Sequence, residues 1–179
     1  GYLHELEGIA NLEVLAMHEE FKRNVGRTIH VLARTRATPG TFYYRRRVFP
    51  TGAAAAYWTA WEKLDIEVGA APVFGIVNRK LHIFWLHMVE APDPTQRMPP
   101  VDTAELESPD PKMMWKIQLA WSELRRSAWT PPRMGARTLH YTEFRPRRSF
   151  HLKTAVHGGD KLAVNIFVST SPEFNDNEL

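Results

Sequence analysis

The chain is dominated by a two-residue alternation of apolar and polar side chains, the pattern of β-strands that bury one face. Branched and aromatic residues, which favour strands, are concentrated in eight short segments. These segments are residues 28–34, 42–48, 64–68, 73–77, 81–88, 115–121, 150–156 and 162–168. We therefore predict a mainly β fold of about eight to ten antiparallel strands joined by hairpins, with little helix.

Turn-forming residues separate two pairs of these segments. The tripeptide at 78–80 begins with Asn, a residue that tolerates left-handed turn conformations. The tripeptide at 158–160 is Gly-Gly-Asp and divides the last two segments, which makes this the clearest hairpin in the chain.

The start of the chain is ambiguous. Residues Leu3–Glu20 have a weak helical period and form the only helix candidate in this part of the sequence. Within them, Leu12–Met17 also alternates as a strand would, so both interpretations stay open. The opening residues lack the basic and apolar regions of a signal peptide, and because the sequence begins with Gly we expect it to be part of a larger polypeptide.

Proline is concentrated between the two halves of the chain. Residues 91–111 hold six of the 13 prolines, which cannot donate sheet hydrogen bonds, and we predict a long exposed loop there. We expect one β-rich domain over residues 1–168 and a frayed acidic tail at 169–179.

Two stretches of the sequence resemble each other. In each, an aromatic strand is followed by a charged turn and then by Trp-Thr, at Trp58-Thr59 and at Trp129-Thr130. The two Trp are 71 residues apart, and omitting the 21-residue Pro-rich loop leaves 50, close to one four-stranded propeller blade. The chain could thus form two to three sialidase- or propeller-like blades, or a β-sandwich whose hairpins each bury a Trp.

Composition excludes several classes of protein. The 179 residues carry a net charge of only +3, which does not favour nucleic acid as a partner. Cys is absent, so disulfides, Cys-based zinc sites and Cys nucleophiles are excluded, and no apolar run is long enough to span a bilayer. We find no motif for a metal, a nucleotide or a catalytic Ser, and we expect no cofactor.

The densest positive cluster is Arg45-Arg46-Arg47. On a strand, Arg45 and Arg47 face one side of the sheet and Arg46 the other. The cluster could be a solvated face with cross-strand pairs, for example to Asp65 or Glu67, or a protein interface, in which Arg and aromatic residues are enriched. Phosphate contact and base stacking on nucleic acid is the least favoured alternative.

Several segments together, in this order, resemble the neuraminidase-like domain of the A component of bacterial Tc insecticidal toxin complexes, the virulence plasmid A proteins. The resemblance covers roughly residues 5–135. The motifs lie at residues 12–14, 28–39, 43–46, 58–66, 72–73, 78–85, 115–123 and 129–131.

The resemblance implies a non-catalytic role in a large secreted or surface-exposed pore-forming toxin. Such an A component is a homopentamer whose outer shell encloses a translocation channel, and it works with the toxin's B and C components. The domain would close this shell through contacts with other domains and neighbouring subunits, and the shell would open when the pH changes. The alternative is a carbohydrate-binding module that recognises host-cell glycans with exposed Trp and Tyr.

A sialidase is not favoured, because the Asp-box turn is missing and no motif places Arg45, Tyr44 and Glu62 as a catalytic set. Instead, we expect charge pairs that break with pH to act as a lock between neighbouring surfaces. Charge density selects the candidate lock residues Arg45, Arg46, Arg47, Glu62, Asp65 and Glu67.

Overall fold

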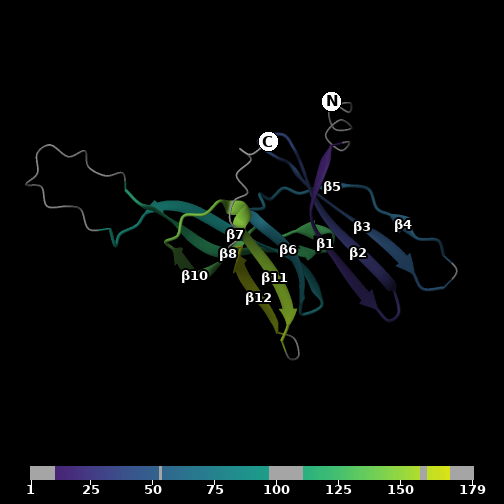
Figure 1. The fold of residues 1–179 in the computed structure, drawn as a ribbon. Helices are drawn as coiled ribbons and strands as arrows, with labels where there is room; N and C mark the ends of the chain where they lie inside the picture. The colour runs from purple at the N-terminus through teal and green to yellow at the C-terminus, as the bar shows by residue number, and fades with distance from the viewer. Residues whose placement is uncertain (1–10, 53, 97–110, 158–160, 170–179) are drawn as a thin grey trace, which may run out of the picture.

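The computed structural model describes residues 11–52, 54–96, 111–157 and 161–169, which form three antiparallel sheets (Figure 1). The first, the N-terminal sheet, has the strand order β1-β2-β3-β4, and β5 also pairs with β3. Its strands are β1 (Leu12–Lys22), β2 (Gly26–Thr35), β3 (Phe42–Pro50), β4 (Tyr57–Trp58) and β5 (Glu62–Lys63).

The second, the central sheet, repeats this meander with the order β6-β7-β8-β10, and β9 also pairs with β8. Its strands are β6 (Ala70–Val77), β7 (Lys80–Pro92), β8 (Met113–Arg125), β9 (Ala128–Trp129) and β10 (Arg133–Tyr141). The third is the C-terminal hairpin, formed by β11 (Phe150–Val156) and β12 (Leu162–Val168) after the short 3₁₀ turn η1 (Arg147–Ser149).

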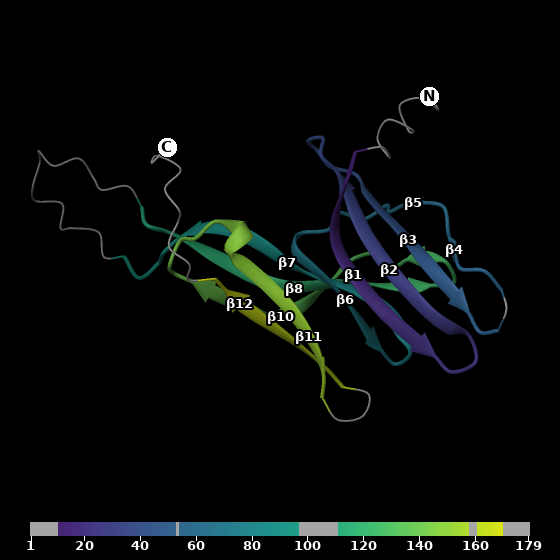
Figure 2. The ribbon, with the colours of Figure 1, turned by 45° about the vertical axis from the view of Figure 1, so that its right-hand side comes forward.

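The central sheet is covered on both faces, as Figure 2 shows by its place between the other two sheets. Along β7, Ile83 and Trp85 pack against the N-terminal sheet. The alternate residues Phe84 and Leu86 pack against the C-terminal hairpin. Because successive side chains of a strand point to opposite faces, a strand covered twice reads as a continuous apolar run. This explains the apolar sequence of residues 81–88.

The predicted fold class is confirmed, since the described residues form antiparallel sheets and their only helical turn is η1. The turn at 78–80 closes a hairpin in which Asn78 and Arg79 have φ of 50° and 62°. The last hairpin also forms, while its turn at 158–160 lies outside the described residues.

Of the two interpretations left open at the start of the chain, the helix over Leu3–Glu20 is wrong for its described part, because β1 begins at Leu12. The alternative strand at 12–17 is confirmed and extends to Lys22. Pairing with β2 from Leu12 to Lys22, interrupted only by a register shift between Val14 and Ala16, outweighs the weak helical period. Residues 3–10 lie outside the described part of the chain.

The strand predicted at 64–68 is wrong. Leu64 and Val68 are buried and Asp65 and Glu67 are exposed, as the alternation predicted, but no strand forms there. The segment connects the N-terminal sheet to the central sheet. The Leu64 amide still donates to the Phe42 carbonyl of β3 at 2.9 Å, but the chain bends at residues 65 and 66. A bent connection between two sheets can alternate in burial as a strand does, so the pattern alone could not separate the two cases.

The predicted Pro-rich loop begins two residues later than expected. Ala91 and Pro92 still pair with β8, at Met114 and Met113, because the last residue of a strand need not donate a ladder hydrogen bond. Residues 97–110 lie outside the described chain. The strand β10 was not predicted, since its sequence does not alternate and its pairing with β8 is irregular between Met134 and Thr138.

The internal resemblance of the sequence has a structural counterpart. The Thr59 amide donates to the Arg46 carbonyl at 2.9 Å, and the Arg46 amide donates to Thr59 Oγ1 at 3.1 Å. In the same way, the Thr130 amide donates to the Glu123 carbonyl at 2.9 Å, and the Glu123 amide donates to Thr130 Oγ1 at 3.0 Å. In both sheets, a Thr hydroxyl replaces a backbone carbonyl as acceptor where a short strand leaves the third strand of the meander.

Candidate functional site

The outer face of the N-terminal sheet, which points away from the central sheet, carries a stack of alternating arginine and aromatic side chains. The Arg45 guanidinium carbon lies 4.0 Å from the ring centroid of Trp58 and 4.2 Å from that of Trp61. Arg47 lies 5.5 Å from Trp58 and 4.9 Å from Phe49. We call this group the arginine–aromatic stack; in order it comprises Arg27, Phe49, Arg47, Trp58, Arg45 and Trp61.

Strand geometry produces this stack. Phe49 is two residues after Arg47 on β3, and Arg27 of β2 is its direct partner across the ladder. Trp58 of β4 is the ladder partner of Arg47, so the indole lies on the same face as both odd-numbered arginines. Cation–π contact attracts a guanidinium to an aromatic face, which holds these long side chains along the sheet.

The stack shields part of its arginines from water. The Nε atoms of Arg45 and Arg47 are buried and have no hydrogen-bond partner in the described structure. Burial lowers the pKa of Arg45 from its ordinary value, although this group stays charged at any physiological pH. The charge is thus partly desolvated and offset by ring faces rather than by a carboxylate.

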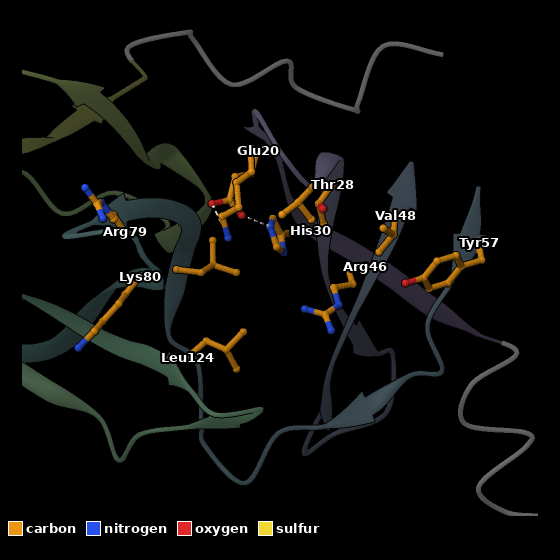
Figure 3. Close-up of a pocket in the computed structure, with 12 residues that line it drawn as sticks. Glu20, Thr28, His30, Arg46, Val48, Tyr57, Arg79, Lys80 and Leu124 are labelled. Carbon is orange, nitrogen blue, oxygen red and sulfur yellow. Dashed lines mark hydrogen bonds and ion pairs between the residues drawn. The ribbon is translucent and has the colours of Figure 1, made fainter. Parts of the chain in front are cut away.

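Arg46 points to the opposite side of β3, as the two-residue period predicts, and lines a cavity of about 320 Å³ between the sheets (Figure 3). The N-terminal sheet contributes Glu20, His30 and Tyr57 to one wall. The other wall belongs to the central sheet, with Arg79, Lys80 and Leu124 among its residues. Among the charged residues that line the cavity, basic ones from both sheets therefore outnumber the single acid, Glu20.

His30 is the buried centre of a polar network beside this cavity. Its Nδ1 lies 2.7 Å from Tyr44 Oη and its Nε2 lies 3.2 Å from Glu20 Oε2. His18 stacks on it with ring centroids 6.4 Å apart. Burial lowers the pKa of His30, and the Glu20 carboxylate opposes this effect, while His18 and Arg46 add to it.

The residues of a sialidase-like set do not converge. Tyr44 is buried in the core between the sheets, whereas Arg45 lies on the outer face of the same strand. Burial also raises the pKa of Tyr44, which disfavours the phenolate. Glu62 is the ladder partner of Tyr44, but Glu62 itself is exposed to solvent. The geometry therefore separates the arginine from the other two groups.

The three candidate acids lie on the surface at the end of the N-terminal sheet. Glu62 belongs to β5, and Asp65 and Glu67 belong to the segment that follows it. All three residues are exposed, and within the described chain none forms an ion pair with the arginines at 45–47. The structure therefore brings Arg45 and Arg47 together with aromatic rings, turns Arg46 to the opposite face of β3, and forms no ion pair between these arginines and the three acids in the described residues.

The central sheet has an acidic centre that sequence reasoning missed. Glu123 binds Lys80 Nζ at 3.0 Å and Arg125 Nε at 2.9 Å, and His82 Nε2 lies 3.8 Å away. The hydrogen bonds from Arg125 and Lys80 lower the pKa of Glu123 to about 2. The Trp-Thr repeat could have located this residue, because Thr130 binds Glu123 as Thr59 binds Arg46.

Within the described ranges, no group of three or more His, Asp or Glu side chains is arranged to hold a metal ion. In the same part of the chain, no helix is long and apolar enough to cross a membrane.

Comparison with known structures gives the same fold in two much longer chains. One is Morganella morganii TcdA4, with a TM-score of 0.64 and 16% identity, covering 93% of this chain and 7% of that one. The other is Yersinia pseudotuberculosis TcaA-TcaB, with a TM-score of 0.51 and 13% identity, covering 97% of this chain and 9% of that one. No curated protein sequence matches the chain.

A family model described as the neuraminidase-like domain matches residues 12–168, nearly the whole described chain. This match, together with the toxin-subunit structures that share the fold, confirms the resemblance that the ordered sequence motifs indicated. The chain therefore belongs to the family of neuraminidase-like domains found in Tc toxin components.

Proposed function

We propose that this chain is a non-catalytic structural domain of a toxin A component and that it closes the outer shell around the translocation channel. The arginine–aromatic stack carries the proposal, because this mixture of residues on an uncovered sheet face is typical of protein interfaces. The large indole of Trp58 remains 42% exposed to solvent in the folded domain. The resemblance to the toxin family supplies the partners: other domains and neighbouring subunits of the same component, together with the B and C components.

Exposed apolar residues extend the same face over β1. Met17 is 62% exposed and Phe21 is 74% exposed, and both are ladder partners of β2 residues on the side of the stack. Val14 is also exposed on this side. Large apolar side chains that remain in water on one sheet face are expected where another protein surface packs. A neighbouring surface would bury these groups together with the stack.

The pH dependence of the proposal rests on the charges around this sheet. Acidic residues of a neighbour would pair with Arg45 and Arg47 on the outer face and, from the other side of β3, with Arg46, while Glu62, Asp65 and Glu67 would pair with its basic residues. Acid would protonate the carboxylates and base would deprotonate lysines, and either change would leave like charges facing each other. His30 beside Arg46 adds a group that gains charge as the pH falls.

The proposal excludes sialidase chemistry. Its support is the separation of Arg45 from Tyr44 on opposite faces of β3 and the burial of Tyr44. A fluorogenic sialoside assay on the 179-residue chain should show no turnover above buffer. Glycan binding is less favoured than protein contact, because Arg45 already occupies ring faces of Trp58 and Trp61.

Charge reversal in the assembled component tests the lock. Arg47→Glu, and the pair Glu62→Lys with Asp65→Lys, should shift the pH at which the shell opens, measured by electron microscopy and dye release between pH 5 and 11. Arg137→Glu on β10 is the control, since it changes the same charge far from the stack. If the lock variants open at the same pH as the control, these residues are not the lock.

A further inference from the structure

The three sheets follow one arrangement, but the third has fewer strands. The first strand of each contacts the first strand of the next, β1 with β6 and β6 with β11. The N-terminal and central sheets each continue through a second, a third and a fourth strand position. In the described residues, the C-terminal hairpin ends after β12, its second strand. By analogy with the other two sheets, a third strand would lie along β12.

The free edge of β12 has a defined set of hydrogen-bonding groups. The Ser169 amide donates to the Ser149 carbonyl and the His157 amide donates to the Lys161 carbonyl, both at 2.8 Å. In an antiparallel ladder such pairs recur at every second residue, so odd-numbered residues of β12 bond to β11. Even-numbered residues point their amides and carbonyls to the other edge, where no described residue pairs.

The side chains of the same even-numbered residues form the inward face of β12. Leu162, Val164, Ile166 and Val168 pack against the core that contains Phe150 and Leu152, yet all four stay partly exposed. Their neighbours Phe150 and Leu152 on β11 are 2% and 5% exposed. Such partial burial of an aliphatic row is expected for an edge strand whose neighbouring strand is missing.

The edge also lacks the usual protection. Exposed edge strands normally carry charges or proline that prevent pairing with another chain. Residues 162–168 contain neither, and the first charged residue before them is Lys161. Such a strand is a template for β-augmentation, in which backbone hydrogen bonds bind an extended segment.

We propose that β12 accepts an extended segment from another part of the same toxin component, with aliphatic side chains at alternate positions and an uncharged inward face. The inference rests on the proposed function. Two observations favour this occupant. The sheets before it complete their meanders with strands of the same polypeptide. The chains that share the fold are also far longer, since this domain covers only 7% and 9% of them. A tethered segment binds at high effective concentration.

Amide hydrogen exchange, measured by NMR on the 179-residue chain, tests the proposal with a peptide probe. The probe is Lys-Val-Thr-Val-Thr-Val-Thr-Val-Lys, N-methylated along one edge so that it cannot assemble with itself. In the free chain, the amides of Val164 and Ile166 should exchange fast while that of Asn165 is protected. Saturating probe should slow exchange at Val164 and Ile166 by at least about tenfold.

Two controls separate edge pairing from nonspecific contact. A probe methylated along both edges should give no protection. Val164→Pro removes one amide of the free edge and should abolish probe binding while the β11–β12 hairpin persists. Asn165→Pro instead removes an amide that bonds to β11, and should lose the hairpin itself. If Val164→Pro fails to fold, the doubly methylated probe still decides.

Three results would overturn the proposal. Protection of Val164 and Ile166 in the free chain at every concentration would show that the chain's own residues already cover the edge. Protection that rises with protein concentration, with a dimer in sedimentation, would identify a second copy as the occupant. Equal binding of the singly and doubly methylated probes would show that the probe does not bind by pairing with the edge of β12. The charge-reversal experiment reads the N-terminal sheet, so either proposal can fail without the other.

Discussion

The N-terminal and central sheets share a meander, a Trp-Thr motif and a buried His beside a Glu, but differ in how many faces are covered. The central sheet packs on both sides, and its charged centre at Glu123 is neutralised by its own Lys80 and Arg125. Among the described residues, the N-terminal sheet packs on one side only, and its Arg45 is stacked on rings instead of paired with an acid.

The comparison shows that the same local pattern can serve stability or contact, depending on what covers it. Thr130 and Thr59 make the same two bonds to the preceding strand. Beside Thr130, the charge of Glu123 is satisfied within the sheet. Beside Thr59, Arg46 opens into the cavity with no carboxylate bound to it in the described structure. We therefore assign folding stability mainly to the central sheet and contact mainly to the N-terminal one.

Truncating the buried sheet should give the largest effect. Trp85→Ala removes a side chain that is 3% exposed between the two sheets, and should cost about 3–5 kcal/mol of unfolding free energy. Phe21→Ala on the uncovered face of the N-terminal sheet should cost less than about 0.5 kcal/mol, since Phe21 is already 74% exposed. Urea denaturation of both variants measures the difference. Comparable losses would contradict the assignment of stability to the central sheet.

Much of this fold was predictable from the sequence because it depends on local rules. The turn at 78–80 and the alternation at 150–168 determine hairpins, and the two-residue period places Arg46 opposite Arg45. The strand predicted at 64–68 does not form, because a bent connection between two sheets can show the same alternation of burial. The sequence did not predict strand β10, because its pairing with β8 is irregular and most of its residues are exposed.

The candidate site was predictable only in part, because its contacts are long-range. The arginine cluster is visible in the sequence, but its ring partners are not, since Trp58 and Trp61 reach it only after the chain has returned alongside β3. The network of Glu20, His30 and Tyr44 combines three strands whose register no local pattern specifies. Only the Trp-Thr repeat gave a sequence signal for the shared geometry.

The two sheets should respond to acid in different pH ranges. Burial lowers the pKa of His30 below 6.5, so the unfolded chain takes up this proton first and stability falls as the pH drops below about 6.5. Glu123 has its pKa lowered to about 2, so its contribution is complete above pH 4.5 and is lost between pH 4.5 and 2.

Single variants should separate these two acid phases in urea denaturation measured at a series of pH values. His30→Gln should flatten the upper phase and Glu123→Gln the lower one, while exposed His151→Gln should change neither. An upper phase that survives in His30→Gln would assign it to another group, with His18 the first candidate, because burial lowers its pKa too.

Removing the Thr hydroxyls should have a moderate effect that differs between the sheets. Thr130→Val deprives the Glu123 amide of its acceptor beside Ser122, which is fully buried, and should cost about 1–2 kcal/mol. Thr59→Val leaves the Arg46 amide where water can replace the lost hydroxyl, and should cost about 0.5 kcal/mol. Denaturant midpoints measure both. Equal costs would mean that the two motifs are equivalent in solvation as well as in geometry.

Replacing one arginine of the stack by lysine should give a small effect and isolates the ring contacts from the charge. Arg45→Lys keeps the positive charge but loses the planar group held between Trp58 and Trp61, and should cost about 0.5–1 kcal/mol. Arg47→Lys should cost less, since its rings lie 4.9 and 5.5 Å away. Urea denaturation followed by Trp fluorescence reports both stability and the indole environment. If the order of the two variants reversed, ring contact would not be what holds Arg45, and the uncovered face would owe its order to packing alone.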